Sequence, residues 1–207
     1  MLLSSSFPPC PRLHPLKGKA LPQKATLQGL HKGELIATIE EDWTPPGSTT
    51  ALKTGWLISI TLASAVTQTP TVKLLYGPGP RDSIEGVAVT RDAVLVAGYQ
   101  NVRGRILRYA YDGRQWLESQ IAMPPNGSVG FAGASSDESV AFATFKDFLR
   151  PDTLYAVDAR AGAARPIQSL PAQFDASGLV SEQYEATSRD GTKAPYFVVH
   201  RRRSEEH

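Results

Sequence analysis

From residue 34 onward, short apolar runs alternate with clusters of Gly, Pro, Asn and Asp. Runs rich in Val, Ile, Thr and aromatic residues are typical of β-strands, and the clusters between them are typical of tight turns. The predicted strands are 34–40, 55–61, 71–76, 83–89, 93–99, 105–111, 115–121, 129–134, 139–145, 153–158 and 166–170. Helical periodicity is limited to a turn at 62–66. The pattern therefore predicts an all-β protein.

A weak internal repeat selects among all-β architectures. Segments starting near residues 91 and 136 align with offsets of 46 and 47, and the matched pairs are Val94 with Val140, Leu107 with Leu154, Asp112 with Asp158 and Pro124 with Pro171. This spacing fits a four-stranded propeller blade of roughly 40 to 50 residues. Residues 35–89 read as a similar unit. We therefore expect a partial β-propeller of about three four-stranded blades, because closed rings have about four to eight.

The last strands are predicted to form a C-terminal β-hairpin, Tyr184 to His200, that turns at Asp190-Gly191. Asp-Gly between two β-rich runs favours a type I′ turn, in which both central residues have positive φ. A lone hairpin is marginal in water and needs a sheet to join. No sheet-forming run follows it in the sequence, so we expect the hairpin to project from the blades with 196–199 more exposed than usual.

Composition and charge limit the classes of partner and the location that the sequence predicts. Lys and Arg total 22 against 20 Asp and Glu among 207 residues, and a net charge of +2 predicts neither a nucleic-acid nor a membrane partner. The apolar run 55–65 is far too short to cross a bilayer. Cys10 is the single cysteine and is interpreted as a free thiol. The start lacks an export signal, which predicts a cytoplasmic protein if the original N-terminus is retained.

Four segments of the sequence are distinctive: "KATLQGLHKGELIATIEEDW", "DSIEGVAVTRDAVLVAGYQNVRGRI", "FKDFLRPDTLYAVDARAG" and "LPAQFDASGLVSEQYEATSRDGTKAPYFVVHRR". Together they resemble the prolyl oligopeptidase family of serine peptidases. In that family a seven-bladed propeller precedes an α/β-hydrolase domain, and "ATSRDGTKAPYFVVHRR" resembles the passage from one to the other. The resemblance implies a disordered leader over 1–23, a partial propeller over 24–180 and the start of a truncated hydrolase domain over 181–207.

The chemistry of a hydrolase is missing from this sequence. The catalytic serine of an α/β-hydrolase lies in Gly-x-Ser-x-Gly, and no such pentad occurs: Gly127-Ser128 lacks the spacing, and the run 133–137 ends in Asp. We therefore assign no catalytic, cofactor or metal residue and expect no cofactor. The resemblance implies a propeller fragment that gates and selects peptides and is inactive alone. The alternative is a non-catalytic binding or assembly module that self-associates through exposed blade edges. A peptide substrate is expected only for the intact members of the family.

Other chemistry-bearing residues are interpreted as structural. No histidine has an obvious partner carboxylate, and the four are His14, His31 in a turn, His200 and His207. The acidic residues are expected to serve turns, and they are Asp82, Glu85, Asp92, Asp112, Asp137, Asp147, Asp152 and Asp158. Gly77-Pro78-Gly79-Pro80 is predicted to be a turn, because its prolines lack the N–H donors of a phosphate loop. The aromatic residues expected in the core between sheets are Trp43, Trp56, Trp116, Phe142, Phe145, Phe148 and Tyr155.

Overall fold

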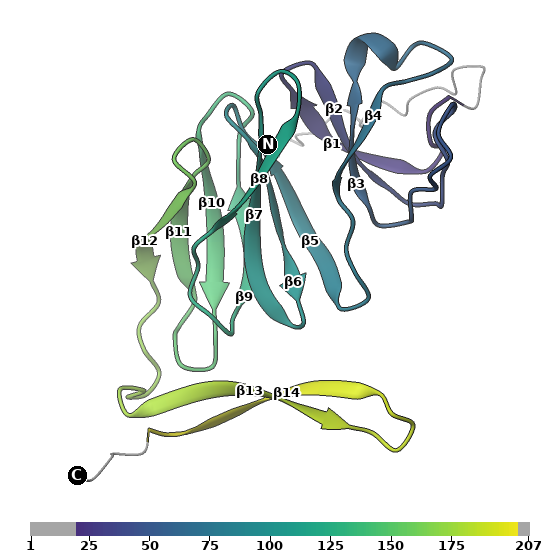
Figure 1. Ribbon diagram of the computed structural model, residues 1–207. Coiled ribbons are helices and arrows are strands. Elements are labelled where there is room, and N and C mark those ends of the chain that lie inside the picture. The colour runs from purple at the N-terminus through teal and green to yellow at the C-terminus, as the bar shows by residue number, and fades with distance from the viewer. Residues whose placement is uncertain (1–19, 203–207) are drawn as a thin grey trace, which may run out of the picture.

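The computed structural model describes residues 20–202, and this part of the chain is all-β. Three antiparallel four-stranded sheets follow one another as blades (Figure 1). The first blade holds β1 (Ala25–His31), β2 (Glu34–Ile39), β3 (Leu57–Thr61) and β4 (Val72–Tyr76). The second holds β5 (Asp82–Val89), β6 (Val94–Gln100), β7 (Arg103–Tyr111) and β8 (Trp116–Ile121). The third holds β9 (Ser128–Gly133), β10 (Val140–Lys146), β11 (Thr153–Asp158) and β12 (Ala163–Ser169).

The predicted partial propeller is confirmed. Each sheet is a simple meander in chain order, and Val94 and Val140 are the first residues of the second strands of neighbouring blades. Leu62–Ser64 forms a short 3₁₀ turn where the helical turn is predicted. Within residues 20–202 no helix is long and apolar enough to cross a membrane. The strand β1 is absent from the predicted set.

Apolar side chains pack between successive blades. Ile36 and Leu57 of the first blade meet Val94 and Val96 of the second. Because successive residues of a strand point to opposite faces, the next residues of β6 point toward the third blade. There Leu95 and Ala97 join the core formed with Ala141, Ala143 and Val157. Each blade is thus stabilised by its neighbours rather than by its own two faces alone.

The two ends of this arc of blades differ. In the first blade, Ile39 and Ile58 on the face away from the second blade are fully buried beneath Trp43 and Leu52 of the connection between β2 and β3. In the third blade, the corresponding face leaves Val140 and Phe142 exposed at 37% and 43%. The end face of the first blade is therefore covered by its own β2–β3 connection, whereas the end face of the third blade is exposed.

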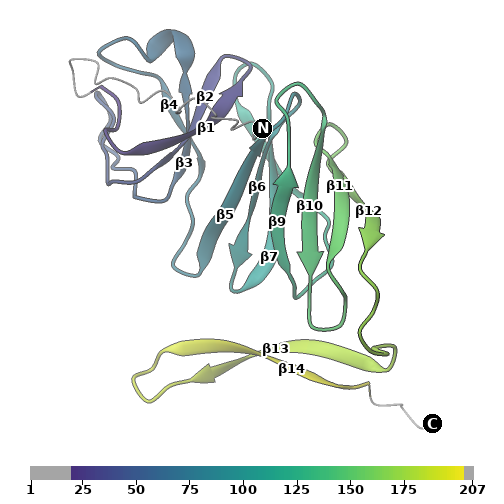
Figure 2. The same ribbon diagram turned by 180° about the vertical axis from the view of Figure 1, so that it is seen from behind.

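The C-terminal hairpin consists of β13 (Leu179–Thr187) and β14 (Lys193–Arg201). Figures 1 and 2 show it running across the ends of the second and third blades. Gln183 Nε2 donates to the carbonyl of Asn101 at 2.9 Å, and Asn126 Nδ2 donates to the carbonyl of Ser181 at 3.0 Å. The expectation that it projects freely is wrong, because loops between strands supply polar partners that the sequence pattern does not reveal.

The exposure of the hairpin matches the prediction in part. Tyr196 and Val199 are exposed at 46% and 43%, whereas Phe197 and Val198 are half-buried. The ring of Phe197 lies 5.3 Å from that of Phe148, in the connection between β10 and β11. Phe197 is therefore partly covered by the blades, and each face of the hairpin carries one half-buried and one exposed apolar residue of β14.

The turn of the hairpin also departs from expectation. Of the two central residues predicted to have positive φ, only Gly191 does, at +85°. The carbonyl of Ser188 accepts from the amide of Gly191 at 3.0 Å, and the amide of Ser188 donates to the carbonyl of Thr192 at 2.8 Å. This is a type I turn completed by a left-handed glycine, the common three-residue alternative. Asp190 has a negative φ, and its side chain accepts from the amide of Thr192.

Candidate functional site: a groove along the innermost strands

The innermost strands of the three blades lie side by side. β1, β5 and β9 are each the first strand of a sheet and form its edge, and β5 contacts both of the others. One backbone edge of each strand therefore faces the axis around which the blades are arranged. In a propeller this position lines the central channel.

Each innermost strand carries a β-bulge at the same place. The pairing with the second strand skips one residue in each blade: Gln28 in β1, Glu85 in β5 and Ala132 in β9. A bulge bends an edge strand and re-aims the extra side chain. The three bulges thus interrupt the pairing of the first and second strands in every blade.

The bulges have a sequence signal that the repeat comparison missed. Each follows an apolar residue and precedes a glycine: Leu27-Gln28-Gly29, Ile84-Glu85-Gly86 and Phe131-Ala132-Gly133. A glycine inside a strand often marks a bulge or a close backbone approach. At Gly29, φ is +155° and an added Cβ would lie 3.0 Å from Cγ2 of Val89.

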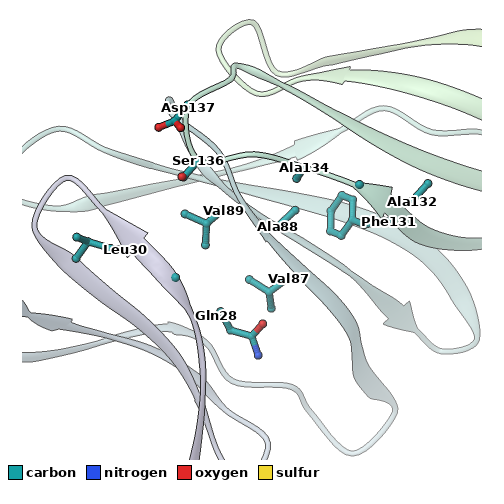
Figure 3. Close-up of a pocket in the computed structure, with 12 residues that line it drawn as sticks. Gln28, Leu30, Val87, Ala88, Val89, Phe131, Ala132, Ala134, Ser136 and Asp137 are labelled. Carbon is teal, nitrogen blue, oxygen red and sulfur yellow. The ribbon is translucent and has the colours of Figure 1, made fainter. Parts of the chain in front are cut away.

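An open groove of about 710 Å³ lies where the three strands meet (Figure 3). Leu30, Val87, Val89 and Phe131 line it with apolar surface, and Asp137 stands at one end. A groove that combines apolar side chains with polar groups is suited to binding a ligand. Glycine and alanine dominate the β9 side, so a ligand there meets the backbone closely.

A second groove of about 540 Å³ adjoins the first between β1 and β5. Gln28 lines both grooves, and Glu85 lines the second. The carboxylate of Glu85 accepts from Oγ of Ser83 at 2.9 Å. The prediction that Glu85 serves a turn is wrong, because it is the bulge residue of β5.

Comparison with known proteins agrees with this arrangement. Residues 57–169, more than half of the chain, match the family model described as "Prolyl oligopeptidase, N-terminal beta-propeller domain". The chain belongs to the prolyl oligopeptidase family. The resemblance seen in the sequence is therefore confirmed.

Individual relatives in the prolyl oligopeptidase family are much longer. An uncharacterized peptidase of Sinorhizobium fredii is 32% identical over 184 residues, which span 88% of this chain and 25% of that protein. The structure of a post-proline cleaving enzyme from Rickettsia typhi superposes with a TM-score of 0.70 at 27% identity, over 87% of this chain and 26% of the other. Oligopeptidase B from Leishmania major, at 18% identity and a TM-score of 0.62, shares the fold. The chain spans about a quarter of the length of these relatives.

The described histidines differ from their predicted surroundings. His31 ends β1 and is only 2% exposed, whereas a turn was expected; its Nδ1 lies 3.0 Å from the carbonyl of Thr90. Burial lowers the pKa of the His31 imidazole, opposed by that hydrogen bond. His200 has a carboxylate after all, because Nε2 lies 3.1 Å from Oε2 of Glu182 across the hairpin. His14 and His207 lie outside the described residues.

Five of the acidic residues fall into two groups. Asp112, Asp147 and Asp158 accept from backbone amides two and three residues ahead, which confirms their predicted turn role. Asp82 and Asp92 instead tie segments together. Asp82 lies 3.6 Å from Arg105, and Asp92 accepts from Ser139 in the third blade at 2.5 Å. The hydrogen bond from Ser139, assisted by Arg160, lowers the pKa of Asp92.

Three of the aromatic residues lie between sheets as predicted: Trp116 and Tyr155 pack against the inter-blade clusters, and Phe145 is fully buried. Trp43 and Trp56 instead pack on the face of the first blade that points away from the second blade. Phe142 and Phe148 are exceptions with large exposed fractions, since Phe142 points away from the second blade and Phe148 lies in a loop under the hairpin. Gly77 to Pro80 form an irregular connection from β4 to β5. Residues 20–202 contain no group of three His, Cys, Asp or Glu that could hold a metal.

Proposed function

We propose that this chain acts as the gating and substrate-selecting part of a prolyl oligopeptidase-like peptidase and does not itself break peptide bonds. The groove along β1, β5 and β9 carries the proposal, because its position at the innermost strands and its mixed apolar and polar lining suit an extended peptide. The relatives whose names specify cleavage after proline support proline-containing peptides as the ligand class. Gln28 and Asp137 would orient the peptide through its backbone polar groups.

Binding is tested by titrating isotope-labelled protein with short proline-containing peptides. We expect chemical-shift changes at Leu30, Val87 and Phe131, which line the groove from three strands. Ala132→Trp fills the groove and should abolish these changes. Val66→Trp is the control, because Val66 is highly exposed and outside the lining. Shifts that persist in Ala132→Trp would place the ligand elsewhere.

Inactivity is tested with a chromogenic Gly-Pro substrate and a serine-directed fluorophosphonate probe. Acyl transfer needs an activated nucleophile, a base and an oxyanion hole. The 207 residues contain no Gly-x-Ser-x-Gly pentad, so we expect neither turnover nor labelling. Stoichiometric labelling of one serine, with turnover lost on its replacement by Ala, would overturn this part of the proposal. A complete prolyl endopeptidase serves as the positive control.

A binding or assembly module without any peptidase role is the second candidate. The observation that favours it is the exposed sheet face of the third blade, where Val140 and Phe142 lie in the open. Failure of every proline-containing peptide to bind the groove, together with a stable assembly, would favour this candidate.

A further inference from the structure

Two buried polar atoms lie between the first and second blades, in a region here named the seam. Among the described residues, Nε2 of His31 and Oε2 of Glu34 have no hydrogen-bond partner, although each side chain is only 2% exposed. His31 ends β1 and pairs directly with Glu34 at the start of β2, so both side chains lie on one face of the sheet. That face is directed at the second blade, because the ring of His31 lies 5.5 Å from that of Trp116. Buried polar atoms without a partner are rare and call for an explanation.

Both atoms are hydrogen-bond acceptors. Nδ1 of His31 lies 3.0 Å from the carbonyl oxygen of Thr90, which can only accept, so Nδ1 carries the proton. Burial lowers the pKa of this imidazole and favours the neutral ring, whose Nε2 then presents a lone pair. On Glu34, the hydroxyl of Thr61 donates to Oε1 at 2.9 Å, and Nζ of Lys73 lies 3.4 Å from the same oxygen. Oε2 therefore still needs a donor.

A water molecule suits these two acceptors better than a metal ion. Directly opposed residues of paired strands have Cβ atoms roughly 4.5–5.5 Å apart, so one small molecule can touch both side chains. A water has two O–H donors, one for each acceptor, and buried waters typically serve such otherwise unsatisfied groups. The ammonium group of Lys73 beside Glu34 repels a cation. The described residues also offer no group of three His, Cys, Asp or Glu for a metal.

We infer that one internal water molecule binds in the seam, where it donates one hydrogen bond to Nε2 of His31 and the other to Oε2 of Glu34. It completes a polar chain that starts and ends on the second blade. The chain runs from the carbonyl of Thr90 to His31, and across the water to Glu34. Lys73 continues it to the hydroxyl of Tyr111, at 2.9 Å from Nζ.

This water would join the two blades at the end opposite the C-terminal hairpin. Thr90 follows β5 and Tyr111 ends β7, whereas the hairpin runs across the other end of these strands (Figures 1 and 2). Both blades that form the seam are present in this chain, and the inference does not rest on the proposed peptide groove.

Water–protein contacts in the nuclear magnetic resonance spectra of the purified chain test the site. We expect nuclear Overhauser effects, with the sign of a long-lived bound water, between water and the carbon-bound ring protons of His31. Exchanging hydroxyl protons can imitate such signals, so Thr61→Val and Tyr111→Phe are the controls and should leave the effects in place. Glu34→Leu removes one of the two acceptors and should abolish them. Circular dichroism establishes whether this variant is folded, and the parent chain decides the matter if it is not.

The tautomer of His31 is an independent test. Long-range proton–nitrogen correlation of the imidazole above neutral pH should show a protonated Nδ1 and a bare Nε2. A protonated Nε2 would overturn the inference, because the two buried atoms would then not both be acceptors. A folded parent chain without the water contact would overturn it too, as would a contact that either hydroxyl control removes. A contact that persists in folded Glu34→Leu would show that the water does not bridge the two residues.

Discussion

Arg81 and Glu185 are 104 residues apart in the chain, and Nη1 of the arginine lies 2.5 Å from Oε2 of the glutamate. Arg81 lies in the connection between the first and second blades, and Glu185 lies in β13. Gln183 makes two further contacts on the same side of β13, one to the carbonyl of Asn101 and one to Arg103. Side-chain contacts at one end of the blades thus hold the hairpin, and among the described strands β13 and β14 pair only with each other.

Removing these contacts should release the hairpin without unfolding the blades. The Arg81–Glu185 pair is half-exposed, so it contributes at most about 1 kcal/mol, and the Gln183 contacts contribute a similar amount. We expect Gln183→Ala combined with Glu185→Ala to speed amide exchange at Phe197 about tenfold or more. Arg189→Ala is the control, because Arg189 lies at the exposed tip of the hairpin. Equal exchange rates in the two variants would show that the hairpin is held by other contacts.

The turn between β6 and β7 stores strain that one substitution can relieve. Asn101 and Val102 have φ of +48° and +62°, and Val102 is a β-branched residue in a left-handed conformation. Left-handed backbone costs such a residue roughly 1–2 kcal/mol, and Asn tolerates it better. We expect Val102→Asn to stabilise the chain by about 1 kcal/mol in urea unfolding. Val66→Asn, at a position without positive φ, should change stability by less. Destabilisation by Val102→Asn would mean that packing of the valine outweighs the strain.

The strand order followed from the sequence because local patterns determine it. Propeller blades are meanders of consecutive strands, so periodicity and turn residues suffice to place them. The alignment of Val94 with Val140 in the internal repeat was wrong by one residue. Val94 faces the preceding blade, whereas Val140 faces away from its preceding blade, so Ala141 is the residue equivalent to Val94. A shift of one residue exchanges the two faces of a strand. The repeat therefore located the correct strands but not the exposed face.

The remaining features depend on contacts that no local pattern encodes. β1 was missed because the run from Ala25 to His31 is interrupted by Gln28-Gly29, which reads as a turn and is a bulge. The groove could be recognised only when the three apolar-x-Gly motifs lay side by side in space. The docking of the hairpin rests on partners such as Asn101 and Asn126, whose sequence surroundings indicate turns alone.

Because of the bulge in β5, replacing Gly98 by Ala should cost much more stability than replacing Gly133 by Ala. Gly98 pairs with Ile84 beside the bulge, and an added Cβ would lie 2.1 Å from the carbonyl oxygen of Ser83. Backbone cannot move aside cheaply, so Gly98→Ala should destabilise the chain by about 2 kcal/mol or more. Gly133→Ala, where an added Cβ meets nothing within 4 Å, should change stability by less than about 0.5 kcal/mol. Similar unfolding midpoints for the two variants would contradict the close approach of β5 and β6.

His31 should make the stability of the chain depend on pH near neutrality. Its Nε2 is buried without a hydrogen-bond partner and its ring lies 5.5 Å from that of Trp116, so burial lowers the pKa of the folded imidazole. Below about pH 6.5 the unfolded histidine binds a proton that the folded one refuses, so stability is present above that pH and is lost as pH falls through it. We expect a loss of about 1 kcal/mol between pH 7 and 5.5 in urea unfolding. His31→Gln removes the titrating group while retaining a donor for the Thr90 carbonyl, and every other histidine is unchanged. The variant should therefore show a flatter dependence, and a slope equal to that of the parent would assign the effect to another group.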